Sequence, residues 1–134
     1  MCKDLESFRI DLALKHDFNL EDAFHLFDCN DLGCITIQNL ADGLRDNLQF
    51  GEFCDEDMFM FMQRVDRKNL KRITFRQFYD AVLPFTPEYA SRAQDRPVFF
   101  KKHNTELRHY FQRETREALR NLFRAMFNNE RNLE

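Results

Sequence analysis

Apolar residues recur along the chain at the spacing of helices. Leu20, Ala23, Phe24 and Phe27 fall at positions i, i+3, i+4 and i+7, which is one face of a helix. Asn19 precedes this stretch and suits an amino-terminal cap, because its side-chain oxygen can accept a hydrogen bond from an unpaired backbone N–H. The pattern predicts a helix that ends near Phe27, after a shorter helical segment within residues 1–17.

The same spacing returns after each of two polar interruptions. A third helix, with Leu40, Leu44 and Leu48 on one face, is predicted to end near Gly51. A fourth is predicted around residues 58–65, and a fifth follows residue 75 and stops at Pro84, which cannot continue a helix. Residues 18–85 therefore form two predicted helix–loop–helix units.

The remainder of the chain divides into a connector and a terminal helix. Residues 86–104 contain two of the three prolines and no sustained period, which predicts an ordered or semi-ordered linker. The helical pattern restarts within residues 105–134, where a long amphipathic helix is expected. Its apolar stripe consists of Leu119, Leu122, Phe123, Met126 and Phe127.

Composition supports an all-α fold and excludes a membrane span. The 134 residues include 16 Phe, no Trp and only 3 Gly, a balance that favours helical packing over sheets and tight turns. No run approaches the roughly 18 apolar residues that a transmembrane helix needs. The four cysteines form no CxxC pair and the first residues lack the apolar core of a signal peptide, so we expect reduced thiols and an intracellular protein.

The first loop, residues 28–39, has the offsets of a twelve-residue calcium loop with a damaged ligand set. Such loops supply oxygen from positions 1, 3, 5, 7, 9 and 12 and place Gly at position 6. Leu32 at position 5 offers no side-chain oxygen, which predicts an affinity of about 10⁻³ M or weaker. The candidate metal ligands that remain are Asp28, Asn30, the carbonyl of Cys34, Thr36 and Asn39.

The second loop, residues 66–77, keeps the leading Asp66 but has fewer possible metal ligands than the first. Lys68 and Lys71 stand at positions 3 and 6, and Gln77 replaces the final carboxylate. Positive charge repels a dication, so no calcium binding is expected in this loop.

These segments resemble calmodulin-like EF-hands. The stretch AFHLFDCNDLGCITIQNL agrees with that family in both helices and in the loop. In such pairs the residues at position 8 face each other across two short strands, and here these residues are Ile35 and Ile73. The resemblance predicts an all-α fold of paired EF-hand units with a short two-stranded loop pairing, plus the carboxy-terminal amphipathic helix.

A narrower resemblance covers almost the whole chain. The phrases LALKHDFNLEDAFHLFD, RITFRQFYDAVLPFTPEYA and FQRETREALRNLF are similar to EF-hand proteins of ciliates and other protists, some of them components of the ciliary axoneme. The resemblance implies a structural module in the cilium or cytoskeleton, associated with microtubules, with tubulin or axonemal proteins as partners.

Two surfaces are candidates for partner binding. Met58 and Met60, interpreted as facing away from the stripe that contains Phe61, can line a groove for a partner helix or belong to the surface. On the terminal helix, whose segment 101–134 carries 8 basic against 5 acidic residues, the arginines can grip an acidic protein or be solvated. These arginines are Arg116, Arg120 and Arg124, and the apolar stripe beside them can dock on this chain or on a partner.

The sequence contains no signature of catalysis. None of the four histidines falls in a nucleophile or metal motif, and there is no glycine-rich phosphate loop. The functional hypothesis is a non-enzymatic adaptor that holds protein partners in a large assembly, without nucleic acid and with at most weak calcium as a cofactor. Two alternatives remain: a weak calcium or magnesium sensor that uses the first loop, and an accessory subunit of an enzyme complex, for example a mitochondrial one.

Overall fold

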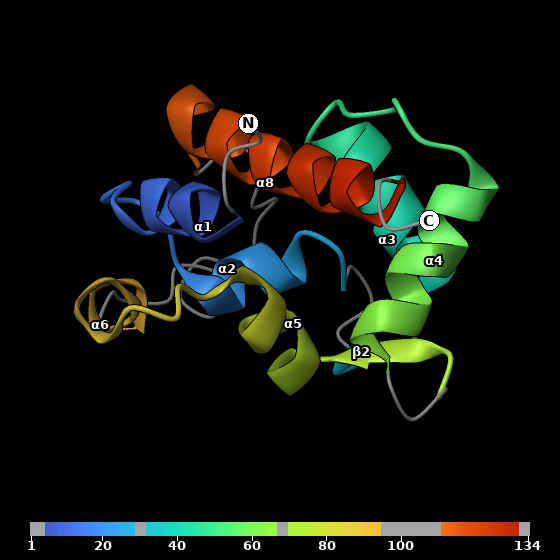
Figure 1. The fold of residues 1–134 in the computed structure, drawn as a ribbon, viewed down its shortest axis with the longest axis horizontal. Helices are drawn as coiled ribbons and strands as arrows, with labels where there is room; N and C mark the ends of the chain where they lie inside the picture. Colours follow the sequence, from blue (N-terminus) through green and yellow to red (C-terminus); the bar gives the residue numbers. More distant parts are fainter. Residues whose placement is uncertain (1–4, 29–31, 67–69, 95–110, 132–134) are drawn as a thin grey trace.

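The chain folds into a mostly helical structure with one small antiparallel sheet (Figure 1). The computed structural model describes residues 5–28, 32–66, 70–94 and 111–131. The elements are α1 (Leu5–Ala13), α2 (Leu20–His25), β1 (Cys34–Thr36), α3 (Ile37–Asp42), the π-helix η1 (Gly43–Asn47), α4 (Asp55–Val65), β2 (Arg72–Thr74), α5 (Phe75–Val82), α6 (Pro87–Gln94) and α8 (Arg113–Arg131).

The predicted cap at Asn19 is confirmed. Its Oδ1 accepts hydrogen bonds from the backbone N–H groups of Glu21 at 2.9 Å and Asp22 at 3.2 Å. These bonds satisfy donors that have no partner inside the first turn of α2.

The two loops meet as predicted. β1 and β2 pair antiparallel, with Ile35 opposite Ile73. Both side chains are almost fully buried, and this strand pair joins the two helical units through backbone hydrogen bonds.

The third predicted helix is interrupted. α3 passes into the π-helix η1 at Gly43, a change that hydrophobic periodicity does not reveal. A Cβ at Gly43 would overlap the ring of Phe27, so glycine allows α2 and this segment to approach closely.

Within the predicted connector 86–104, residues 87–94 form the helix α6, which the sequence pattern did not predict. Pro87 occupies the first position of the helix, where its missing N–H is not needed. The entry into α6 is fixed from far along the chain: the carboxylate of Glu6 accepts hydrogen bonds from the N–H groups of Phe85 and Thr86, both at 2.9 Å. The rest of this predicted linker, and residues 105–110 of the predicted terminal helix, lie outside the described residues.

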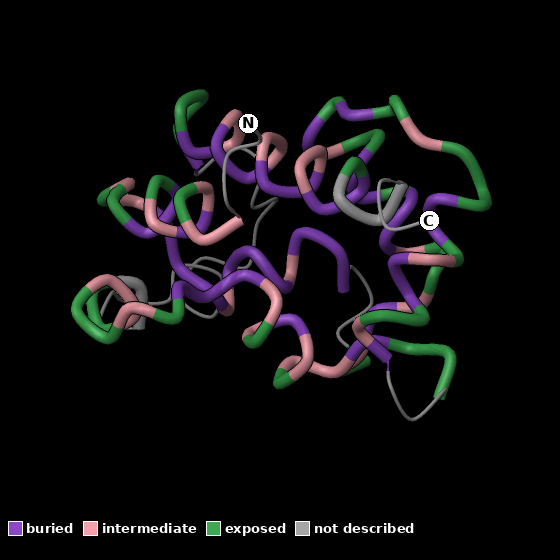
Figure 2. Tube along the Cα trace, viewed as in Figure 1, coloured by how far each residue is buried: buried purple, intermediate pink, exposed green. Residues whose placement is uncertain are grey.

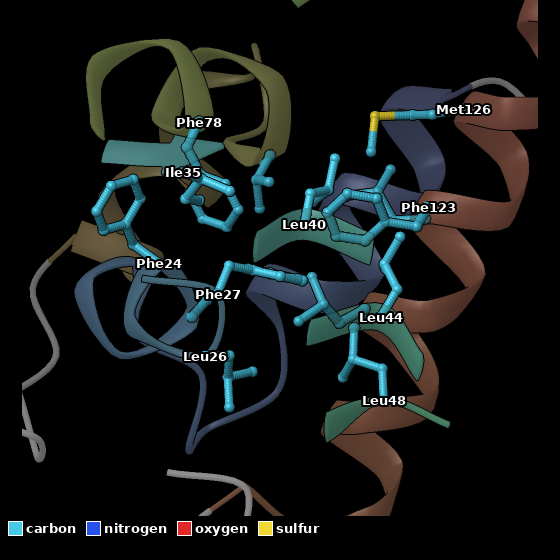
Figure 3. Close-up of a cluster of buried hydrophobic side chains, with 14 of the residues drawn as sticks. Phe24, Leu26, Phe27, Ile35, Leu40, Leu44, Leu48, Phe78, Phe123 and Met126 are labelled. Carbon is cyan, nitrogen blue, oxygen red and sulfur yellow. The ribbon is translucent and has the colours of Figure 1, made fainter. Parts of the chain in front are cut away.

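The terminal helix α8 lies across the body, in contact with α1 and α4 (Figure 1). Figure 2 shows that its inner side is buried along most of its length. In Figure 3, Phe123 and Met126 join Phe27, Leu40 and Leu44 in one apolar cluster. The core therefore includes residues of both α1 and α8.

Candidate functional site

Each loop opens with a buried aspartate whose two carboxylate oxygens bind loop backbone. In the first loop, Asp28 accepts hydrogen bonds from the N–H groups of Leu32 at 2.9 Å and Gly33 at 2.8 Å. Asp28 is only 2% exposed. Its carboxylate thus holds the turn in shape through the chain's own donors.

The second loop repeats the arrangement. Asp66 accepts hydrogen bonds from the N–H groups of Leu70 at 3.0 Å and Lys71 at 2.6 Å. Gly33 and Lys71, at position 6 of the two loops, both have left-handed backbone, with φ of 81° and 63°. The second loop therefore keeps the turn with a lysine, a conformation that side chains with a Cβ rarely adopt.

The electrostatics of Asp66 follow from these bonds. Burial acts to raise its pKa, but hydrogen bonds from the loop backbone and from the Gln77 side chain outweigh burial. The pKa of Asp66 consequently lies below its usual value of 3.8, and the carboxylate is ionised at neutral pH.

The far ends of both loops are closed by capping boxes. In the first loop, Thr36 and Asn39 exchange hydrogen bonds between side chain and backbone N–H, at 3.2 and 3.1 Å. In the second, Thr74 and Gln77 do the same, at 2.8 and 3.2 Å. The amides at position 12 thus start the following helices, α3 and α5.

The predicted metal ligands are therefore only partly brought together. The side-chain oxygens of Asp28, Thr36 and Asn39 already bind backbone N–H groups, and Cys34 is a half-buried residue of β1. Asn30 lies outside the described residues. Each of the bonded oxygens accepts one of these hydrogen bonds and keeps a further lone pair, so the bonds shape the loop without by themselves holding or excluding an ion.

No protein-family model, curated protein or solved structure matches the chain. Across the described ranges, no three His, Cys, Asp or Glu residues are grouped so that they could hold a metal ion. Nor does any described helix have both the length and the apolar character to cross a membrane.

The apolar stripe of α8 lies inside the molecule. Phe123 packs with Phe27 at a ring-centroid distance of 5.6 Å and with Phe61 at 5.9 Å. Phe127 stacks on Phe50 at 5.9 Å with an interplanar angle of 16°. All five residues of the predicted stripe are buried: Leu119, Leu122, Phe123, Met126 and Phe127.

The prediction that Met58 faces away from the core is wrong, since this side chain is 2% exposed. Met58 precedes Phe61, Met62 and Val65 by three, four and seven residues, so helical spacing itself places it on the buried face. Met60 is half-buried, and the neighbouring Phe59 is 56% exposed.

The predicted arginines follow the outer edge of α8 and are half-buried. Arg120 donates from Nη1 to the carbonyl oxygen of Leu48 at 3.3 Å. Arg124 lies 3.5 Å from Glu52 and places its guanidinium 5.5 Å from the ring centre of Phe50. The Nε atom of Arg116 is buried and has no hydrogen-bond partner.

Sequence reasoning missed three residues that tie distant segments together. Asp17 accepts hydrogen bonds from the Gln112 N–H and from the Thr115 hydroxyl at the start of α8. Arg9 donates from Nε to the carbonyl oxygen of Ala81 at 2.8 Å. Glu6 accepts hydrogen bonds from the N–H groups of Phe85 and Thr86, just before α6. No local motif marks these residues, because their partners lie more than 70 positions away.

Proposed function

We propose that the chain is a non-catalytic structural or adaptor protein, built on a degenerate EF-hand pair, that holds protein partners in a larger assembly. One observation carries this proposal. In both loops the opening aspartate and the residues at positions 9 and 12 bind the loop's own backbone. Loops closed in this way can serve as architecture without metal.

The EF-hand part of the proposal is supported by agreement between the loops. Each has aspartate at position 1, left-handed backbone at position 6, a paired isoleucine at position 8 and a capping box between positions 9 and 12. The second loop keeps these features despite its lysines. The shared frame favours descent from a metal-binding loop whose ligands were lost.

The filled groove argues against a calcium sensor. Sensor EF-hands open on binding calcium and expose a Met-rich apolar groove to a partner. Here Phe123 and Met126 of α8 already pack beside Leu40, Phe61 and Phe78, and the gap left among them is only about 10 Å³. The apolar surface is therefore covered before any ion binds.

The accessible partner surface that we propose is the basic edge of α8, defined as Arg113, Arg116, Arg120 and Arg124. Glu117 lies among them and reduces the positive electrostatic potential of this edge. An acidic protein surface is therefore a better match than nucleic acid. Tubulin or another axonemal protein enters as the specific partner through the sequence resemblance alone.

Co-sedimentation of the purified chain with microtubules tests this function. We expect binding that weakens with salt and that is reduced at least tenfold by the double charge reversal Arg113→Glu, Arg124→Glu. The matched control is Arg76→Glu, Arg92→Glu, which reverses two exposed arginines on α5 and α6 and should bind like the wild type.

Two results would contradict the proposal. One is the absence of salt-sensitive binding to microtubules together with cross-links, in the native cell, to a respiratory complex. The other is equal binding by both double variants, because a surface in which the position of the charge is irrelevant is not a specific contact.

A further inference from the structure

A polar cavity of about 260 Å³ lies between the segment that follows η1 and the first turns of α8. Residues 47–49 line one side. Arg113, Arg116, Glu117 and Arg120 line the other. Three of the four arginines of the basic edge line it, but contact with an acidic protein surface does not require a cavity.

Local structure explains how the cavity forms. The three arginines are spaced at i, i+3 and i+7, so they share one face of α8. Opposite them, Gln49 has left-handed backbone with φ of 54°, and the chain reverses so that the Phe50 N–H donates to the Leu44 carbonyl at 2.8 Å. The chain thus ends η1 with a turn that lies against the arginines.

The charges in the cavity are unbalanced. Glu117 is its one acidic lining residue, and its Oε1 lies 3.4 Å from Arg113 and 4.0 Å from Arg120. Arg116 has no ion pair within the described part of the chain, and its buried Nε has no hydrogen-bond partner. The buried Nε is not reachable from the cavity, but Arg116 lines the cavity and brings a positive charge that no carboxylate neutralises there, which favours an anion.

We propose that this cavity binds a phosphate group in its doubly charged form. Three guanidinium groups and one carboxylate leave two positive charges, which a phosphate dianion balances and a single carboxylate does not. Arginine presents a planar fork of donors that matches phosphate oxygens. The volume, below the roughly 300 Å³ at which pockets for drug-sized ligands begin, suits a phosphate group and a few attached atoms.

Titration with inorganic phosphate, followed by NMR of backbone amides at constant ionic strength, is the direct test. Saturable shifts are expected at residues 47–49 and at the start of α8. Arg116→Gln should weaken binding about tenfold, as expected for one lost charge-assisted hydrogen bond. Arg76→Gln is the control, because it makes the same substitution at an arginine that lies outside the cavity, and it should leave the affinity unchanged.

A variant that is expected to strengthen phosphate binding separates an effect on recognition from an effect on folding. Glu117→Gln removes the competing carboxylate and should tighten phosphate binding several-fold, which a merely destabilised protein would not show. The melting temperature of each variant is measured alongside.

The source of the phosphate is distinguished by a phosphoserine peptide and its unphosphorylated form. A phosphopeptide that binds at least tenfold more tightly than inorganic phosphate assigns the cavity to phosphorylated proteins, and equal affinities assign it to small phosphate compounds. The proposal is overturned by unsaturable shifts with both probes, by equal affinity of Arg116→Gln and wild type, or by equally tight binding of acetate. The two tests change different residues: Arg116 and Glu117 for phosphate, and Arg113 and Arg124 for microtubules. Failure to bind phosphate therefore leaves the microtubule result unaffected, although Arg113 also lines the cavity.

Discussion

The Oδ2 atom of Asp17 accepts a hydrogen bond from the backbone N–H of Gln112 at 2.6 Å, across 95 positions of sequence. The Oδ1 atom of the same carboxylate accepts from the hydroxyl of Thr115, which is fully buried. One side chain between α1 and α2 therefore acts as the amino-terminal cap of α8.

Replacement of this cap should destabilise the whole protein. We expect Asp17→Ala to lower the free energy of unfolding by about 1–2 kcal/mol, the usual cost of losing a helix cap. Urea denaturation followed by circular dichroism measures it. Asp11→Ala, which removes an exposed ion pair with Lys15, should change stability by less than about 0.5 kcal/mol. Equal effects of the two substitutions would argue against a cap at Asp17.

The aromatic contacts of α8 predict a larger effect. Phe123→Ala should cost about 3–5 kcal/mol, and the double change with Phe127→Ala should unfold much of the population, because both rings are buried in the core. Thermal melting is the measurement. Phe59→Ala, at an exposed phenylalanine of α4, provides the control and should melt close to the wild type. An unchanged melting temperature for the double variant would mean that α8 docks on a partner and not on its own chain.

Close packing at Gly43 predicts a position-specific effect of one methyl group. Gly43→Ala should destabilise by about 1–3 kcal/mol, because the new Cβ overlaps the Phe27 ring. Gly51→Ala adds the same methyl group where no atom lies within 4 Å, and it should be neutral or slightly stabilising. Chemical denaturation of the two variants side by side gives the comparison. If both lose the same stability, the cause is backbone freedom and not the ring.

Calcium titration distinguishes the two loops. Wild-type protein should give no saturable heat assignable to residues 66–77 below millimolar calcium. Leu32→Asp with Asn39→Glu should tighten binding in the first loop by at least tenfold, because two carboxylates are added at positions 5 and 12 and glutamate can still complete the capping box. The control is the equivalent pair in the second loop, Leu70→Asp with Gln77→Glu. It should not increase calcium affinity, because Lys68 and Lys71 remain in that loop. A first loop that gains nothing would not have the geometry of a calcium loop.

Glu6 predicts a dependence of stability on pH. Burial acts to raise its pKa, but bonds from Phe85 and Thr86 and the charge of Arg9 outweigh burial, so the pKa lies below the usual 4.5. A carboxylate with a lowered folded-state pKa stabilises above the unfolded-state value and loses that contribution as pH falls through the folded-state value. The stability difference between wild type and Glu6→Gln should therefore be largest near neutral pH and should shrink below about pH 4.5. A difference that stays constant from pH 7 to pH 3 would mean that the charge of Glu6 does not matter.

Local patterns predicted much of the fold. The cap at Asn19, the pairing of Ile35 with Ile73 and the apolar stripe of α8 each depend on residues close together or on a repeated offset. The helix over residues 87–94 could not be predicted this way, because its start depends on Glu6, some 80 positions earlier. Met58 differs, because its helical spacing to Phe61 and Val65 already places it on the buried face and no distant contact is needed to explain its burial.

The candidate site was predicted less well than the fold. Ligand offsets identified Asp28, Thr36 and Asn39, but not that their side chains would turn to the backbone. The phosphate cavity depends on Gln49 and the turn after η1, which bring residues 47–49 opposite α8. Only the spacing of Arg113, Arg116 and Arg120 was visible in the sequence.

Burial of α8 between α1 and α4 has a consequence for how the chain is made. Residues 5–65 leave the ribosome well before residues 113–131, so their apolar faces remain uncovered until α8 has been synthesised. Contacts between the first and the last described helices also join distant parts of the chain, and such contacts slow folding. The nascent chain is thus most exposed to aggregation in the interval before its last helix emerges.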